Sequence, residues 1–177
     1  SKSLAPMMTG AVDVYFFDKQ HGIIAGARGV GNSAEEQTAS RTVIASTNDG
    51  GDTWVERYVG STTGHWAWKI SFPTPDIGYI ATQGPAADLV VLKTIDGGAS
   101  WSEIHLGAHD VGFSGAGFIS ANVGWVGADK YAYETADGGA TWKRSSWVKG
   151  QGINRFRFFS DGTGYAIGER VFKYTPK

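Results

Sequence analysis

Three short acidic segments carry the residue types that are best able to do chemistry. They read TNDGGDTW at 47–54, TIDGGASW at 94–101 and TADGGATW at 135–142. Aspartate beside glycine occurs in metal-binding loops and in phosphate-binding loops. A calcium ion, however, needs six or more oxygen ligands, and one Asp-Gly-Gly turn does not supply them. Because a catalytic aspartate is not expected three times in one molecule, we interpret the repeated segment as a structural turn.

This interpretation gives each residue type of the turn a role. The aspartate accepts hydrogen bonds from the turn's own backbone amides, the threonine or serine bonds locally, and the tryptophan packs between neighbouring sheets. Asp-Gly and Gly-Gly pairs are also strong hairpin signals. The residues expected to build the three turns are Asp49, Gly51 and Trp54, then Asp96, Gly98 and Trp101, and finally Asp137, Gly139 and Trp142.

Few other residues are arranged for catalysis. The sequence has no cysteine, no Gly-x-Ser-x-Gly elbow, no phosphate loop and no His-Glu-x-x-His motif. The histidines are scattered, at His21, His65, His105 and His109. An inverting glycosidase needs two opposed carboxylates, and only Asp13 and Asp110 lie near predicted inner strands. We therefore expect no enzyme activity, no metal site and no cofactor.

The composition limits the class of protein. A length of 177 residues suits one domain, here 1–177, and 41% hydrophobic with 19% charged residues is typical of a globular chain. The formal net charge of −1 gives no general attraction to nucleic acid. No apolar run reaches the roughly 18 residues of a membrane-spanning helix, so we expect no membrane insertion.

The elements that position the turns also repeat. Each unit has a phenylalanine, a short turn and a glycine that opens an apolar run, with these glycines at Gly22, Gly78, Gly124 and Gly164. Short runs rich in Val, Ile, Tyr, Phe and Trp are typical of strands. Four antiparallel strands repeated every 40 to 55 residues are the pattern of β-propeller blades. The sequence thus predicts an all-β propeller of about four blades, with 33–41 as a polar loop.

The turn matches Ser/Thr-x-Asp-x-Gly-x-Thr/Ser-Trp, and so resembles the Asp-box, or bacterial neuraminidase repeat. With the flanking Phe and Gly residues, the chain most resembles the photosystem II assembly/stability factor family of propellers, from about Val12 to Tyr174. Sialidases, xyloglucanases and sorting receptors carry Asp-boxes too, so the motif indicates fold more than function. The resemblance implies a periplasmic or extracellular protein that aids assembly by binding a partner.

The number of blades leaves two arrangements open, because that family is usually seven-bladed. The predicted units are 11–60, 61–107, 108–149, and 150–177 completed by 1–10. In the preferred arrangement, 3–8 supplies the missing outer strand of the last unit and closes a four-bladed, monomeric ring. A part of a larger propeller would instead expose two aromatic-rich faces and self-associate.

The inner strands border the central channel, so we expect a binding site there. Counting back by twos from Phe17, Phe72, Phe118 and Phe159 aligns four pairs: Tyr15 and Asp13, Ile70 and Trp68, Ala116 and Ser114, Arg157 and Arg155. The resemblance implies an arginine-rich patch that holds a partner protein, which fits Arg155 and Arg157. The alternative for this pair is a solvated strand, or an ion pair with Asp13. The segment of His65, Trp66 and Trp68 is a second candidate, with inter-blade packing as its alternative.

Three functions remain in competition. The first is a non-enzymatic propeller that binds a protein or peptide, in a role like that of an assembly or stability factor. The second is a carbohydrate-binding or glycosidase-related protein with a glycan as its ligand. The third is a structural domain of a larger secreted protein.

Overall fold

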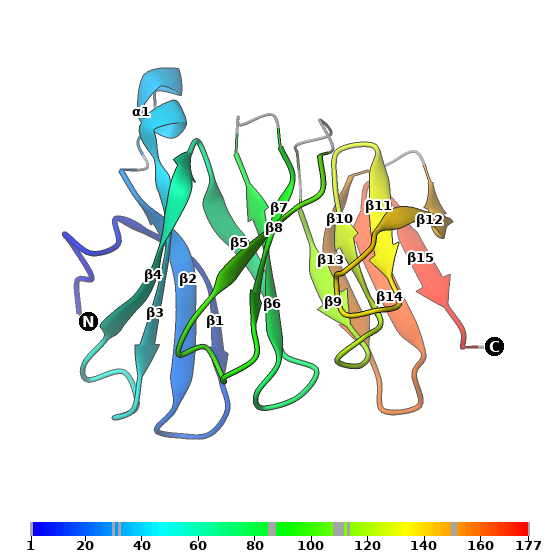
Figure 1. Cartoon of the computed structure of the whole chain (residues 1–177), viewed down its shortest axis with the longest axis horizontal. Helices are drawn as coiled ribbons and strands as arrows, with labels where there is room; N and C mark the ends of the chain where they lie inside the picture. Colours follow the sequence, from blue (N-terminus) through cyan, green and yellow to red (C-terminus); the bar gives the residue numbers. More distant parts are fainter. Residues whose placement is uncertain are drawn as a thin grey trace.

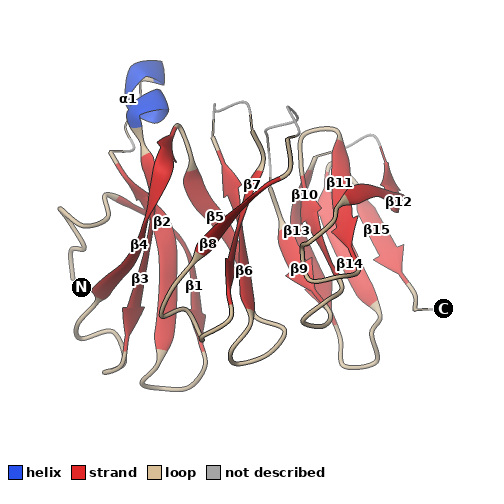
Figure 2. Ribbon diagram, in the orientation of Figure 1, coloured by secondary structure: helices blue, strands red, loops and turns tan. Residues whose placement is uncertain are grey.

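The computed structural model describes residues 2–29, 31, 33–84, 88–107, 112, 114–149 and 152–176. These residues form four antiparallel sheets that follow one another in chain order, with one short helix (Figures 1 and 2). The prediction of an all-β propeller of about four blades is confirmed. Within these ranges, no helix has the length and apolar character needed to cross a membrane.

The strands are named in chain order. Sheet 1 contains β1 (Gly10–Phe16), β2 (Gly22–Arg28), β3 (Arg41–Thr47) and β4 (Val55–Thr63). Sheet 2 contains β5 (Trp66–Ser71), β6 (Gly78–Gln83), β7 (Val90–Thr94) and β8 (Ser102–His105). Sheet 3 contains β9 (Ala116–Phe118), β10 (Gly124–Gly127), β11 (Tyr131–Thr135) and β12 (Lys143–Lys149). Sheet 4 contains β13 (Ile153–Phe158), β14 (Gly164–Gly168) and β15 (Val171–Tyr174).

The core lies between the sheets, where strands such as β2, β6 and β7 have buried residues at successive positions and so on both faces. One apolar cluster joins sheets 1 and 2 around Ile44 and Ile80. A second joins sheets 2 and 3 around Tyr79 and Val126, and a third joins sheets 3 and 4 around Trp125. Each sheet therefore packs face to face with its sequence neighbour, as propeller blades do.

A phenylalanine on each inner strand lies over the glycine that opens the next strand. A Cβ atom added to Gly124 would lie 2.2 Å from the Phe118 ring, so this position requires glycine. The same contact joins Phe16 to Gly22, and Phe158 to Gly164. The register predicted from Phe17 and Phe159 was therefore wrong by one residue in sheets 1 and 4. Adjacent phenylalanines, 16–17 and 158–159, caused the error.

The inner strands share a second irregularity. In β1, β5 and β13 one residue has no partner on the neighbouring strand, and these bulged residues are Val12, Trp68 and Asn154. Each lies four positions before the phenylalanine that covers the glycine, so the bulge repeats with the sheets. A bulge bends its strand and turns the neighbouring side chains toward a new direction.

The ends of the chain differ from the preferred prediction. Residues 3–8 do not complete sheet 4, whose described residues form three strands. They lie beside sheet 1 instead, because the Thr9 amide donates to the Ala27 carbonyl and Arg28 Nε donates to the Met7 carbonyl, at 2.9 and 3.0 Å. Figure 1 shows sheet 1 and sheet 4 at opposite ends of the row.

The segment predicted as a polar loop contains the helix α1 (Ala34–Ala39). Ser33 caps it, because the Ser33 hydroxyl accepts from the Glu36 amide while the Glu36 carboxylate accepts from the Ser33 amide. This reciprocal capping box stabilises a helix that is too short to persist without it.

Candidate functional site

The inner strands of all four sheets line one pocket. Its volume is about 330 Å³, and β1, β5, β9 and β13 all contribute to its lining. The polar side chains of the lining are Asp13, Tyr15, Ser71, Arg155 and Arg157. The sequence prediction of a site at the inner strands thus named three residues that the structure brings to one pocket, namely Asp13, Arg155 and Arg157.

Arg155 and Arg157 are exposed on β13 and lie on the same face of the strand. Neither guanidinium forms an ion pair or a hydrogen bond with another described residue. The alternative of an ion pair with Asp13 is not found in the structure. The Asp13 carboxylate accepts instead from the Val14 and Ile70 amides, at 3.1 and 3.0 Å. The pocket therefore carries two unpaired positive charges.

With the corrected register, Arg155 and Arg157 are also equivalent to different residues of the other sheets. They occupy the positions of Lys69 and Ser71 in sheet 2, and of Gly115 and Gly117 in sheet 3. In sheet 1 the equivalent residues are Asp13 and Tyr15, so charged, polar, small and aromatic residues all occupy these positions. The two arginines are thus compatible with the fold without being required by it.

The second candidate segment, His65, Trp66 and Trp68, does not line this pocket. His65 is buried, and its Nε2 lies 2.9 Å from the Asp88 carbonyl oxygen, while burial lowers its pKa. Trp66 is half-buried at the start of β5. Trp68 reaches across from sheet 2 to sheet 4, where its Nε1 donates to Asn154 Oδ1 at 2.7 Å. The Trp68 ring also carries the Lys69 ammonium at 4.8 Å from its centroid.

The repeated turns, called DGG turns below, form closed hydrogen-bond networks. In the first, Asp49 Oδ1 accepts from the Thr47 hydroxyl and from the Thr53 amide, both at 2.8 Å. The Gly51 amide donates to the Thr47 hydroxyl at 2.9 Å, and Gly50 and Gly51 both have positive φ. The other two DGG turns repeat these bonds around Asp96 and Asp137.

These bonds stabilise the ionised aspartates. Hydrogen bonds from the side chain and amide of Thr53 lower the pKa of Asp49 to about 2. Ser100 and Thr141 act in the same way on Asp96 and Asp137, whose pKa values are also about 2. An aspartate whose acceptor oxygens serve its own turn is a structural residue rather than a general acid or base.

The turn tryptophans pack against the phenylalanines of the inner strands. Trp101 meets Phe72 edge to face at 6.1 Å between ring centroids, and Trp142 meets Phe118 in the same way at 6.3 Å. Both lie at the apolar clusters between sheets. Trp54 meets Phe16 at 6.2 Å, on the outer face of sheet 1.

His105 on β8 lies in a further cluster of titratable side chains. Its Nδ1 lies 2.6 Å from Asp88 Oδ2 and its Nε2 lies 3.1 Å from Glu103 Oε2. The hydrogen bond to Asp88 raises the pKa of His105. The other residues considered from sequence, His109 and Asp110, lie outside the described residues. In the part of the chain that is described, no group of His, Cys, Asp or Glu side chains could hold a metal ion.

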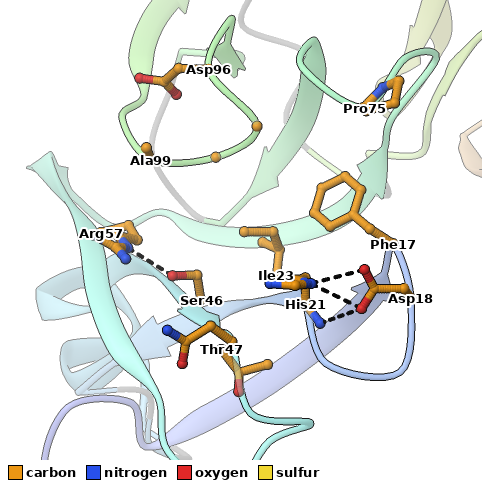
Figure 3. Close-up of a pocket in the computed structure, with 14 residues that line it drawn as sticks. Phe17, Asp18, His21, Ile23, Ser46, Thr47, Arg57, Pro75, Asp96 and Ala99 are labelled. Atoms are coloured by element: carbon orange, nitrogen blue, oxygen red, sulfur yellow. Dashed lines mark hydrogen bonds and ion pairs between the residues drawn. The ribbon is translucent and has the colours of Figure 1, made fainter.

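A second cavity, of about 340 Å³, lies between sheets 1 and 2 beside the DGG turn of sheet 2 (Figure 3). Ile23 forms part of its floor, and polar residues line its mouth. His21 Nδ1 lies 2.8 Å from Asp18 Oδ2, and Arg57 Nε donates to Ser46 Oγ at 2.7 Å. Sequence reasoning did not find this cavity.

The next junction between sheets explains why this cavity exists. There, the paired residues Tyr79 and Lys93 of sheet 2 reach the DGG turn of sheet 3 and donate to the Gly138 carbonyl, at 3.2 and 2.7 Å. In sheet 1 the equivalent pair is Ile23 and Ser46. Because these side chains are shorter, they leave a gap beside the turn of sheet 2, although Ile23 still packs against Gly98. The cavity is thus a packing difference between repeats, and we place no function in it.

The sheets, their face-to-face packing and the central pocket define a β-propeller. No protein-family model matches the chain, and no curated protein sequence matches it.

Solved structures share this fold. Over 97% of its length, the chain is similar to YCF48 bound to a D1 peptide, with a TM-score of 0.65 and 23% identity. It is equally similar to YCF48 from Cyanidioschyzon merolae, with a TM-score of 0.65 and 22% identity over 97% of the chain. The GH74 enzyme of Niastella koreensis matches 90% of the chain with a TM-score of 0.61 and 14% identity. The predicted likeness to photosystem II assembly factor propellers is therefore confirmed at the level of fold. The chain spans 51% and 55% of the two YCF48 chains and 26% of the GH74 chain.

Proposed function

We propose that this chain binds an acidic peptide segment of a partner protein in its central pocket. The observation that carries the proposal is the pair of unpaired, exposed arginines, Arg155 and Arg157, at a pocket that four inner strands build together. Two like charges on one strand face repel each other, and an anionic ligand relieves that repulsion.

The chemistry of the lining fits a peptide carboxylate. A guanidinium presents its N–H groups in a planar fork that matches a carboxylate, so each arginine can hold one Asp or Glu side chain or a chain terminus. Ser71 and Tyr15 add hydroxyl groups beside apolar surface from Ile70 and Phe72. The surface of this lining is more polar than apolar, which suits a charged ligand.

The similar structures support this choice. One of the YCF48 structures is described as bound to a D1 peptide, so the fold is able to carry a peptide. A role as an assembly or stability factor would follow if the bound segment belongs to a partner that is being assembled. A GH74 enzyme has the same fold, and a glycan ligand is therefore the outcome against which the peptide is tested.

Peptide binding is measured by fluorescence anisotropy with labelled short peptides rich in Asp and Glu, together with the D1 peptide. We expect the double change Arg155→Gln and Arg157→Gln to weaken the affinity about tenfold at low salt, because each exposed charge-assisted contact contributes about 0.5–1 kcal/mol. The difference should shrink as salt screens the charges.

The control removes the same charge elsewhere, by Lys130→Gln and Arg170→Gln, two exposed residues outside the pocket lining. We expect this control to bind nearly as the parent does. Equal loss in both double variants would assign the effect to net charge and overturn the site. Oligosaccharide binding on a glycan array with no peptide bound would overturn the peptide function itself.

A further inference from the structure

The two faces of each sheet pack on different neighbouring sheets. The tail face packs on the next sheet and the head face packs on the preceding sheet. Residues one position after the opening glycines lie on the tail face, and Ile23, Tyr79 and Trp125 are 1%, 0% and 4% exposed there. The equivalent residue of sheet 4 is Tyr165, which is 36% exposed because no sheet covers it.

The rest of the tail face of sheet 4 follows the same rule. Ile44, Val91 and Ala132 occupy one position of the third strand of each sheet and are all 0% exposed, while their equivalent in sheet 4, Val171, is 70% exposed. Ile167, beside it on β14, is 43% exposed. This end of the molecule has the residue types of a buried junction.

The head face of sheet 1 shows the complementary pattern. Val14 and Phe16 are 53% and 42% exposed on β1. Their equivalents in sheet 3, Ala116 and Phe118, are 5% and 6% exposed because sheet 2 covers them. The molecule therefore carries one uncovered tail face and one uncovered head face.

Two polar side chains on the tail face indicate which surface packs against it. At the junction of sheets 2 and 3, the Tyr79 hydroxyl donates to the Ala121 carbonyl at 2.7 Å, and Lys93 Nζ donates to the Gly138 carbonyl at 2.7 Å. Tyr79 and Lys93 are cross-strand partners, and so are Tyr165 and Lys173 in sheet 4. We call such a cross-strand Tyr and Lys pair, which binds the DGG turn of the following sheet, a clasp. Tyr165 and Lys173 give sheet 4 the residues of a second clasp.

Within the described residues, Tyr165 and Lys173 bind no turn. No hydrogen bond joins the Tyr165 hydroxyl or the Lys173 ammonium to another described residue. The matching turn is also free, because Gly50 is exposed whereas Gly138 is buried beneath its clasp. The Lys19 carbonyl lies beside Gly50 as the Ala121 carbonyl lies beside Gly138.

We propose that two copies of this chain associate head to tail, with Tyr165 and Lys173 of each copy donating to the Lys19 and Gly50 carbonyls of the other. Both end faces are then covered in both copies. The argument for a second copy is the match between the Tyr165 and Lys173 pair and the exposed turn at Gly50, which repeats the contact seen between sheets 2 and 3. A tail-to-head contact that closes on itself after two copies leaves no free face for further growth.

Association is measured without any ligand, by size-exclusion chromatography with light scattering and by sedimentation velocity at micromolar concentration. We expect a dimer for the parent chain. A charge on either face should give monomers, with Ile167→Glu blocking the tail and Val14→Glu blocking the head. Ile95→Glu is the control, because Ile95 is 71% exposed in the DGG turn of sheet 2, away from both faces. We expect it to stay dimeric.

Mixing the two blocked variants tests the direction of the contact. The free head of one and the free tail of the other can form one intact junction, so mixed dimers should appear in a head-to-tail arrangement. The double change Tyr165→Phe and Lys173→Met, which removes only the clasp, should weaken the dimer at least about tenfold. A monomeric parent, an open polymer, or a dimer that survives Val14→Glu would each overturn the proposal. Val14 lines the central pocket, and Arg155 and Arg157 alternate with the head-face residues Phe156 and Phe158, so the two arginines lie on the tail face. Peptide binding is therefore measured separately, on the parent and on the Ile167→Glu variant, whose changed residue lies outside the pocket lining.

Discussion

The clasp between sheets 2 and 3 gives the sharpest test of how the blades are joined. Replacing Tyr79 by Phe removes one hydroxyl and leaves the ring, which lies parallel to Phe118 with a centroid distance of 3.6 Å. Burial raises the pKa of Tyr79 to about 12, so the hydroxyl is a donor at any ordinary pH. The variant therefore isolates the polar part of the junction.

The magnitude follows from the acceptors that lose their donor. The Gly138 carbonyl keeps Lys93 Nζ at 2.7 Å, while the Ala121 carbonyl loses the hydroxyl at 2.7 Å. One lost hydrogen bond with one unsatisfied carbonyl costs about 1.5 kcal/mol. For a chain of this size that corresponds to a fall of about 3–6 °C in Tm.

Urea unfolding followed by tryptophan fluorescence, with calorimetry alongside, measures the change. The control is Tyr15→Phe, since Tyr15 also stacks on a phenylalanine, Phe72, but its hydroxyl has no partner among the described residues. We expect the control to change stability by less than about 0.5 kcal/mol. Equal effects of the two changes would refute the clasp. A double-mutant cycle with Lys93→Met should show coupling, because both side chains serve Gly138.

Two further predictions concern the DGG turns. Asp49, Asp96 and Asp137 have pKa values of about 2, below the ordinary 3.8, so their contribution to stability is complete above about pH 4 and is lost as the pH falls toward 2. Unfolding midpoints measured from pH 6 to 2 should fall over that window, and a triple Asn variant that keeps the same acid profile would contradict this. Trp101→Ala should destabilise by about 2–4 kcal/mol in urea unfolding, because Trp101 packs between sheets 1 and 2. Trp54→Ala, at the equivalent position of the DGG turn of sheet 1 on an uncovered face, should cost clearly less, and equal losses would show that inter-sheet packing is not the cause.

The repeat was the most informative feature of the sequence. Three segments in register around Asp49, Asp96 and Asp137 predicted turns, strands and the propeller, because each turn forms its bonds within eight residues. Local chemistry of this kind can be read from a sequence. The same reasoning placed Asp13, Arg155 and Arg157 at the inner strands, where the structure has them.

The errors came from places where the sequence was locally ambiguous. Adjacent phenylalanines at 16–17 and 158–159 each offered two registers, and the constant six-residue spacing to the glycine decides between them. Residues 3–8 were assigned to sheet 4 by counting missing strands, but the Arg28 side chain binds Met7, and the adjoining Thr9 amide bonds to Ala27, both in sheet 1. The capping box at Ser33 was a readable helix signal that the polar composition concealed.

Other features depend on pairs of residues from different sheets, so no single segment encodes them. The cavity of Figure 3 arises because Ile23 and Ser46 stand where the next sheet has Tyr79 and Lys93. Comparing repeats at the register of the structure, rather than within one segment, makes such differences visible. The Tyr165 and Lys173 pair was found in the same way.

The bulges of the inner strands are positions where the side chain can vary without changing the blade. A bulged residue has no partner in the ladder, so exchanging its side chain disturbs neither the strand register nor the phenylalanine that covers the glycine. The three bulged positions already hold an aliphatic, an aromatic and an amide side chain, in Val12, Trp68 and Asn154. The last two meet across the inner strands through one hydrogen bond. The side chains at these sites can therefore differ from sheet to sheet, while the blades that support them stay the same.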